Sequence, residues 1–271
     1  MKRTMQTGKK SLIIVLIAAF AFSVMGIFDF IPVKPVKAVG TTYYVSTSGD
    51  DNNNGTSEQT PWRTLAKVSS MTFSPGDQIL LKRGDTWTGE TLKLRNNGGS
   101  RFNWTVLSAY GTGDRPKIYP GANSPESVTV ENNDLEIRNC GWKIIGIEVG
   151  YAKQGIYWKD RRTGCEIEDQ LDGFWVEDCY IHHMTGLDEE GGWSNGIHTS
   201  CINSWVNYVT FRNNIIEYVD CGSFITRVNY LHIDNCELNY CGYFGFKTCM
   251  LINGTIDDCD IMHIGILGRA T

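Results

Sequence analysis

Hydrophobic and polar residues alternate in a short phrase that returns along the second half of the chain. The copies lie at 135–140, 174–179, 209–214, 231–236 and 254–259. Alternation with a period of two is typical of a β-strand, and Asn or Asp near the end of each copy suits a turn. The last three copies start 22 and 23 residues apart, whereas the earlier gaps of 39 and 35 fit one coil plus an inserted loop. This pattern predicts an all-β fold, a right-handed parallel β-helix whose coils bury their apolar faces by stacking.

Residues 39–135 are predicted to form an N-terminal cap and the first coils, and residues 136–271 the later coils. Short strands are expected at 42–46, 78–82, 92–94, 104–107 and 117–119. A small amphipathic helix is expected over 61–68, with Trp62, Leu65 and Val68 as its apolar stripe. Such a helix can cover the unpaired strand edges of an open first coil. Because the chain stops in mid-coil without a polar cap, we expect it to be truncated at the C-terminus.

The first 38 residues have the features of a secretory signal peptide. Four basic residues among the first ten precede an apolar run over 11–28, and residues 36–38 have the small-residue pattern of a cleavage site. The alternative is an uncleaved membrane anchor, because the run is about long enough to span a bilayer. Removal of residues 1–38 changes the formal net charge from −5 to −10. We expect a secreted, extracellular monomer without a nucleic-acid partner and without stable membrane association after cleavage.

All nine cysteines follow residue 38. An even number in a secreted chain would indicate a disulfide framework, but this number is odd. Cys140, Cys179, Cys236 and Cys259 share the last position of the repeated phrase. Equivalent positions of successive coils stack about 4.8 Å apart, so we expect a ladder of small buried thiols in the core.

Several motifs in the first half resemble the start of secreted, pectate-lyase-like right-handed β-helix proteins. They lie at 43–50, 54–56, 61–65, 76–85 and 109–113. The resemblance covers essentially the whole chain after residue 38 and implies the fold more strongly than the activity. Similar proteins include polysaccharide lyases, glycoside hydrolases, uronate epimerases and non-catalytic surface proteins. The pectin-hydrolase signature, paired Asp with Gly-His-Gly and Arg-x-Lys, is absent from this sequence.

A second strand in each repeat is predicted to carry one outward column of side chains. Its members are Tyr157, His198, Thr226 or Arg227, Lys247 and Arg269. For β-elimination of a uronate polymer, Lys247 is the candidate base, because like charges at Arg227 and Arg269 would lower its pKa. His198 is a candidate acid or substrate binder, and Tyr157 a candidate sugar-stacking ring. The simpler interpretation of this column is a solvated basic face.

The loop at 186–195 supplies candidate oxygen ligands. Asp188, Glu189 and Glu190 suit Ca²⁺, the one cofactor this sequence suggests, or else the carboxylate pair of a glycosidase. Trp193 is either a sugar platform or a loop anchor. Three adjacent acids in a Gly-rich loop are also a common solvated feature. His182 and His183 are adjacent, so on a strand they would point to opposite faces and could not chelate one ion together.

The sequence therefore favours a secreted enzyme that cleaves an acidic, uronate-containing polysaccharide by β-elimination. Two alternatives remain open at this point. One is a non-catalytic carbohydrate-binding or cell-surface module, and the other is a glycoside hydrolase that uses acids of the 188–190 segment.

Overall fold

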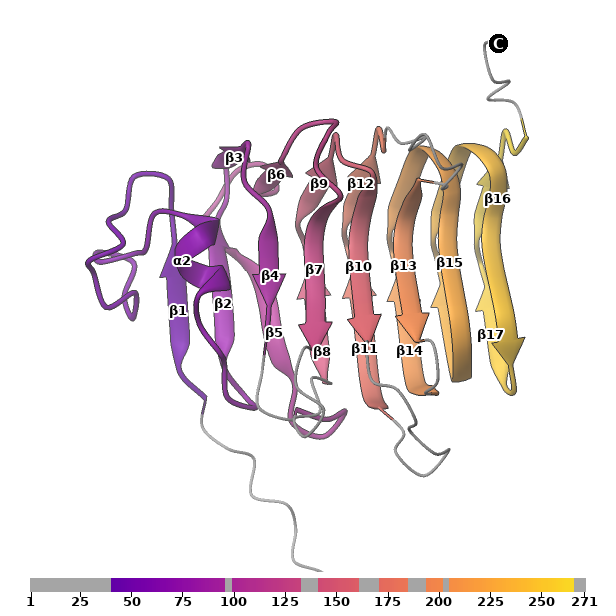
Figure 1. Cartoon of the computed structure of the whole chain (residues 1–271), viewed down its shortest axis with the longest axis horizontal. Coiled ribbons are helices and arrows are strands. Elements are labelled where there is room, and N and C mark those ends of the chain that lie inside the picture. The colour runs from indigo at the N-terminus through magenta and orange to yellow at the C-terminus, as the bar shows by residue number, and fades with distance from the viewer. Residues whose placement is uncertain are drawn as a thin grey trace, which may run out of the picture. The chain divides into compact units, whose positions relative to one another are not determined.

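The computed structural model describes residues 40–95, 99–132, 141–160, 171–184, 194–201 and 205–265. This part of the chain is a stack of parallel strands with one short helix (Figure 1). The signal-peptide prediction for residues 1–38 lies outside the described residues. Among the described residues, no helix has the length and apolarity needed to cross a membrane.

The strand pairings define three faces, which each coil visits in turn. The first face comprises β1 (Thr42–Val45), β2 (Gln78–Lys82), β5 (Thr105–Tyr110), β8 (Trp142–Ile145), β11 (Leu171–Glu177), β14 (Val206–Arg212), the end of β15 (Ile215–Asp234) and β17 (Gly254–Asp257). The second face comprises β3 (Thr86–Thr88), β6 (Lys117–Tyr119), β9 (Glu148–Gly150), β12 (Tyr180–His182), the start of β15, the start of β16 (Glu237–Leu251) and β18 (Asp260–Met262). The third face comprises β4 (Leu92–Leu94), β7 (Glu126–Asn132), β10 (Gln154–Asp160), β13 (Asn195–Cys201), the middle of β15 and the end of β16.

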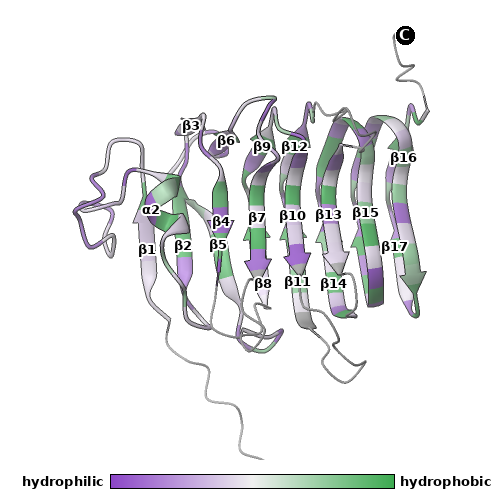
Figure 2. Cartoon of the chain, viewed as in Figure 1, coloured by the Kyte–Doolittle hydropathy of each residue, from purple (hydrophilic) through white to green (hydrophobic). Residues whose placement is uncertain are grey.

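The register confirms the repeat that the sequence predicted. Thr210 pairs with His232 and His232 with Thr255, so equivalent residues of these coils are 22 and 23 apart. Figure 2 shows hydrophobic and polar residues interspersed along the strands. Inward residues are buried between coils, and the predicted parallel β-helix is therefore confirmed.

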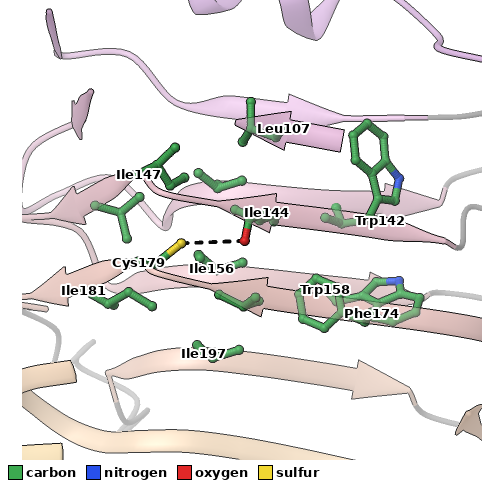
Figure 3. Packing of buried hydrophobic residues seen from close by; sticks show 14 of the residues in the cluster. Leu107, Trp142, Ile144, Ile147, Ile156, Trp158, Phe174, Cys179, Ile181 and Ile197 are labelled. Atoms are coloured by element: carbon green, nitrogen blue, oxygen red, sulfur yellow. Dashed lines mark hydrogen bonds between the residues drawn. The ribbon is translucent and has the colours of Figure 1, made fainter. Parts of the chain in front are cut away.

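Aromatic and branched side chains fill the interior. Trp142, Trp158 and Phe174 are almost completely buried, and Figure 3 shows them packing beside Ile144 and Ile156 from neighbouring coils. Burial of a large apolar side chain contributes about 1.5–3 kcal/mol, so each coil is stabilised mainly by the coils above and below it.

In the four repeated phrases that the structure describes, the fifth residue turns the chain out of the first face. Asp178, Asn213, Asn235 and Asp258 all have positive φ, between 47° and 54°. Asn and Asp tolerate this left-handed conformation better than other residues with a Cβ atom, because their short polar side chains bond locally. The turn role that the sequence predicted for these positions is confirmed.

The sixth residue of each phrase points into the core. Cys179 and Cys236 are buried there as free thiols, Cys259 is partly buried, and the fully buried Asn214 occupies the same position in the intervening coil. Cys179 Sγ donates to the carbonyl of Ile144, as Figure 3 shows. Among the described coils, the thiol ladder predicted from the spacing is present only in part, because Asn214 interrupts it and Cys259 is partly exposed. Cys140 lies outside the described residues.

The predicted helix over 61–68 is shorter than expected. Only α2 (Leu65–Ser69) is helical, because Trp62 instead bridges to Val45 and Thr64 caps the helix. The Thr64 side chain accepts a hydrogen bond from the Lys67 N–H at 3.0 Å, which satisfies one of the free donors of the first turn. The predicted apolar stripe is nonetheless confirmed, because Trp62, Leu65 and Val68 are all buried.

Candidate functional site

An outward column on the third face contains three of the residues predicted from the sequence. Tyr157 pairs with His198, His198 with Phe224, and Phe224 with Lys247. The prediction that Tyr157, His198 and Lys247 share one column is therefore confirmed. We refer to Tyr157, His198, Phe224 and Lys247 as the third-face column.

The prediction that Thr226 or Arg227 completes this column is wrong. Arg227 pairs with Met250, three residues beyond Lys247, so it does not lie opposite the Lys247 ammonium group in the register. Arg227 is therefore not the direct like-charge neighbour of Lys247 that the sequence argument required. Arg269, the other residue in that argument, lies outside the described residues.

A glycine pattern in the sequence could have identified Phe224. Each column residue stands two positions after a glycine, at Gly155, Gly196, Gly222 and Gly245. At the first three glycines, a Cβ atom would approach the carbonyl oxygen of the next glycine to about 2.4–2.6 Å, so no side chain fits between the coils there. The steric need for glycine fixes the position of the outward residue two places later.

Ring stacking holds the third-face column together. The rings of Tyr157 and His198 are 4.5 Å apart and nearly parallel at 8°, and His198 lies 5.1 Å from Phe224 at 25°. The ammonium groups of Lys159 and Lys247 lie 5.2 Å and 5.1 Å from the Tyr157 and Phe224 ring centroids. Because ring faces are covered by neighbouring rings and cations, the column offers mainly ring edges and positive charge to a ligand.

Burial, together with the nearby Lys159 ammonium, lowers the pKa of His198 to about 4. The Nδ1 atom of His198 has no hydrogen-bond partner among the residues that the structure describes. Hence His198 is a neutral imidazole at pH 7, and a role as a proton donor at that pH would require a bound ligand to change its surroundings.

We expect this low pKa to make the protein less stable in acid. The unfolded chain takes up a proton near pH 6.5 and the folded chain only near pH 4. His198 should therefore reduce the free energy of unfolding by up to about 3 kcal/mol as the pH falls through this window. Urea denaturation of the wild type and of His198→Phe, at steps between pH 7 and pH 4, measures the difference. Phenylalanine preserves stacking without a titrating group, so equal pH slopes would contradict the assignment.

The remaining predicted site residues lie outside the described part of the chain. These are Trp193, Arg269 and the three candidate Ca²⁺ ligands Asp188, Glu189 and Glu190. Within the described ranges there is no group of three or more His, Cys, Asp or Glu residues that could hold a metal ion. Calcium binding therefore stays a prediction.

A polar cluster on the second face was missed by the sequence reasoning. The carboxylate of Glu148 accepts a hydrogen bond from the Tyr119 hydroxyl, lies 3.1 Å from Nε2 of His182 and 3.7 Å from Nζ of Lys117. Gly150 lies between Tyr119 and His182 in the register, and a Cβ there would be 3.0 Å from the His182 ring. The residues come from three different coils, so no motif within one short stretch of the sequence predicts the cluster.

The expectation that His182 and His183 point to opposite faces is wrong. Their Nδ1 atoms lie 2.8 Å apart, because β12 ends at His182 and His183 has a φ of 50°. A left-handed residue breaks the alternation on which the strand argument relied. Burial lowers the pKa of His182, although the neighbouring Glu148 carboxylate acts in the opposite direction.

No protein family model matches this chain. Comparison with solved structures finds proteins of similar fold. A GH136 lacto-N-biosidase from Eubacterium ramulus superimposes with a TM-score of 0.60 and 18% identity, over 75% of this chain and 42% of that chain. The pectate lyase Pel9A gives a TM-score of 0.54 and 19% identity, over 87% of this chain and 57% of that chain. At such identities the likeness concerns the fold alone, and that fold is a parallel β-helix.

One curated protein is similar in sequence. Over 87 residues, 31% of this chain, the sequence is 42% identical to a lacto-N-biosidase from Bifidobacterium longum subsp. longum. The match covers 5% of that protein. The chain thus spans a small part of this relative and less than half of the structural neighbour from Eubacterium ramulus.

Proposed function

We propose that this chain is the β-helix of a carbohydrate-active enzyme that hydrolyses glycosidic bonds. The observation that carries this proposal is the 87-residue segment that is 42% identical to a lacto-N-biosidase. The superposition on a second lacto-N-biosidase supports the same fold. Our proposed substrate class is an oligosaccharide that contains a lacto-N-bioside unit, and the proposed place of action is outside the cell.

The glycan is proposed to lie along the third-face column. Its partly exposed ring edges and the ammonium group of Lys247 can contact sugar hydroxyls along several coils, whereas the Lys159 ammonium is paired with Glu126 at 3.4 Å. Hydrolysis also needs two carboxyl groups, one to protonate the leaving oxygen and one to act as nucleophile or base. Asp188 and Glu190 are our candidates, because they precede β13, the strand of His198, in the sequence.

The structure describes the C-terminal end of the loop at 186–195, and hydrogen bonds hold this end in place. Ser194, which directly precedes β13, donates its N–H and its hydroxyl to the carboxylate of Asp220, at 3.0 and 3.1 Å. Ser194 Oγ also accepts from the Asp220 N–H at 3.0 Å. The chain is thereby anchored four residues before His198.

A chromogenic lacto-N-bioside tests this proposal. The purified protein should release the chromophore, and Asp188→Asn and Glu190→Gln should each reduce kcat by about 100-fold or more, since acid–base catalysis contributes about 10²- to 10⁴-fold. Glu58→Gln, an exposed acid on a distant loop, is the matched control and should leave kcat unchanged. Full activity in both acid variants would reject these residues, and binding without turnover would favour the carbohydrate-binding module.

The second candidate function is β-elimination of a uronate polymer. It is favoured by the position of Lys247 at one end of the column that contains His198, where an amine could remove the proton next to the uronate carboxylate. The measurement is the ultraviolet absorbance of the unsaturated product, with pectate and alginate as substrates, in Ca²⁺ and in a chelator. Elimination that disappears in Lys247→Ala would establish the lyase and overturn hydrolysis as the main activity.

A further inference from the structure

A hollow of about 480 Å³ lies at the corner between the first and second faces, away from the third-face column. It is built by the turns that follow β2, β5, β8 and β11 in four successive coils, and β6 and β9 lie side by side at its edge (Figure 1). Its charged lining residues are Arg83, Asp114, Arg115, Lys117, Glu148 and Asp178. The hollow therefore has three cations and three carboxylates, and the Glu148 cluster lies at its edge.

Two arginines in the hollow are held by backbone carbonyls. Nη1 of Arg83 donates to the carbonyl of Gly113 at 3.3 Å, and Nε of Arg115 donates to the carbonyl of Asp178 at 2.8 Å. Neither guanidinium has an ion-pair partner among the described residues. Each therefore keeps charged N–H donors for a ligand, in the planar arrangement that suits a carboxylate.

The third turn of the hollow contains a glycine with a left-handed backbone conformation. A Cβ atom at Gly146 would lie 3.7 Å from Nη2 of Arg83, and the φ of Gly146 is 71°. A side chain at this position would be strained and would occupy space beside the guanidinium.

The three carboxylates restrict the kind of ligand. Lys117 lies 3.7 Å from Glu148, which is also bonded to Tyr119 and His182, so this acid is already satisfied. The carboxylates of Asp114 and Asp178 are exposed and have no ion pair within the described ranges. A bare phosphate ion would offer them few or no donors, whereas sugar hydroxyls can donate to them while a carboxylate on the same ring binds the arginines.

We infer that this hollow is a second saccharide-binding site, specific for a sugar unit that carries a carboxylate. Arg83 and Arg115 bind the carboxylate, and Asp114 and Asp178 accept hydrogen bonds from ring hydroxyls. The site is separate from the proposed cleavage site on the third face, so it would hold an acidic branch or chain unit of the glycan and need not take part in bond cleavage.

The test compares D-galacturonic acid with D-galactose, which differ only in the group at C6, and with inorganic phosphate. Ligand-observed NMR titrations of the purified protein should show galacturonate binding at least about tenfold more tightly than galactose, since hydrogen bonds to charged groups are the stronger kind. Added salt should weaken it, because part of the attraction is between partly exposed charges.

Arg83→Gln and Arg115→Gln should each weaken galacturonate binding by about tenfold or more, with little effect on galactose. Arg212→Gln is the matched control, because this exposed arginine lies on the first face outside the hollow. Unchanged galacturonate binding in both hollow variants would overturn the proposal, as would equal affinity for galactose. If inorganic phosphate binds as tightly as galacturonate, the hollow is a simple anion site, and this result would also overturn the proposal. Binding is measured without turnover, so inactivity on a lacto-N-bioside would not affect this result.

Discussion

Replacement of Asn214 by alanine is expected to lower the free energy of unfolding by about 2–6 kcal/mol, or about 1–3 kcal/mol for each of two buried groups left unsatisfied. The Asn214 side chain is fully buried between coils. Its Oδ1 accepts from the Cys179 N–H at 3.0 Å, and its Nδ2 donates to the Val176 carbonyl at 2.9 Å. Alanine removes both partners at a point that the surrounding structure closes to water.

Asn214→Cys is the matched control, because cysteine is the natural residue at this position in neighbouring coils. The Cys236 N–H already donates to Cys259 Sγ at 3.5 Å, the sulfur counterpart of the bond from Cys179 to Asn214. A thiol at position 214 should therefore restore part of the lost stability. In urea denaturation, the free energy of unfolding should be highest for the wild type, lower for Asn214→Cys and lowest for Asn214→Ala. Equal stability of wild type and alanine variant would show that the amide contributes nothing to the packing of the coils.

Replacement of Gly196 by alanine is expected to destabilise the protein by about 3 kcal/mol, near the upper end of ordinary overpacking. The added Cβ would lie 2.6 Å from the carbonyl oxygen of Gly222 and 2.5 Å from Cγ2 of Ile216. Backbone of the next coil cannot move aside without disturbing the ladder between β13 and β15. Because His198 stands two residues later, the same change should also disturb the third-face column.

Gly245→Ala, in the same row of glycines, separates this crowding from the general effect of alanine on a strand. A Cβ at Gly245 would meet only side-chain atoms, the nearest being Cγ2 of Ile261 at 3.1 Å. Flexible side chains can shift, so we expect less than about 1 kcal/mol there. Thermal or urea denaturation of both variants provides the comparison, and similar losses at the two positions would contradict the close-approach explanation.

The outward column shows how far a repeat can be interpreted without coordinates. Tyr157, His198 and Lys247 were aligned by their turns, and the register confirms the alignment, because coils of a β-helix place equivalent residues directly above one another. Phe224 was missed, since Thr226 or Arg227 was aligned with the other members of the column instead. Steric necessity at Gly222 proved the better guide to geometry.

The sequence by itself determined the architecture: the strand period, the coil length, the buried thiols and the Asn and Asp turns all follow from local patterns that repeat along the chain. Only the tertiary structure decided which polar groups meet. His182 and His183 come together through a left-handed residue, and Glu148 contacts both Tyr119 and His182 from neighbouring coils. The corner hollow unites turns from four coils. Such meetings depend on side-chain directions and on spaces between coils, which a one-dimensional pattern of hydrophobic and polar positions does not encode.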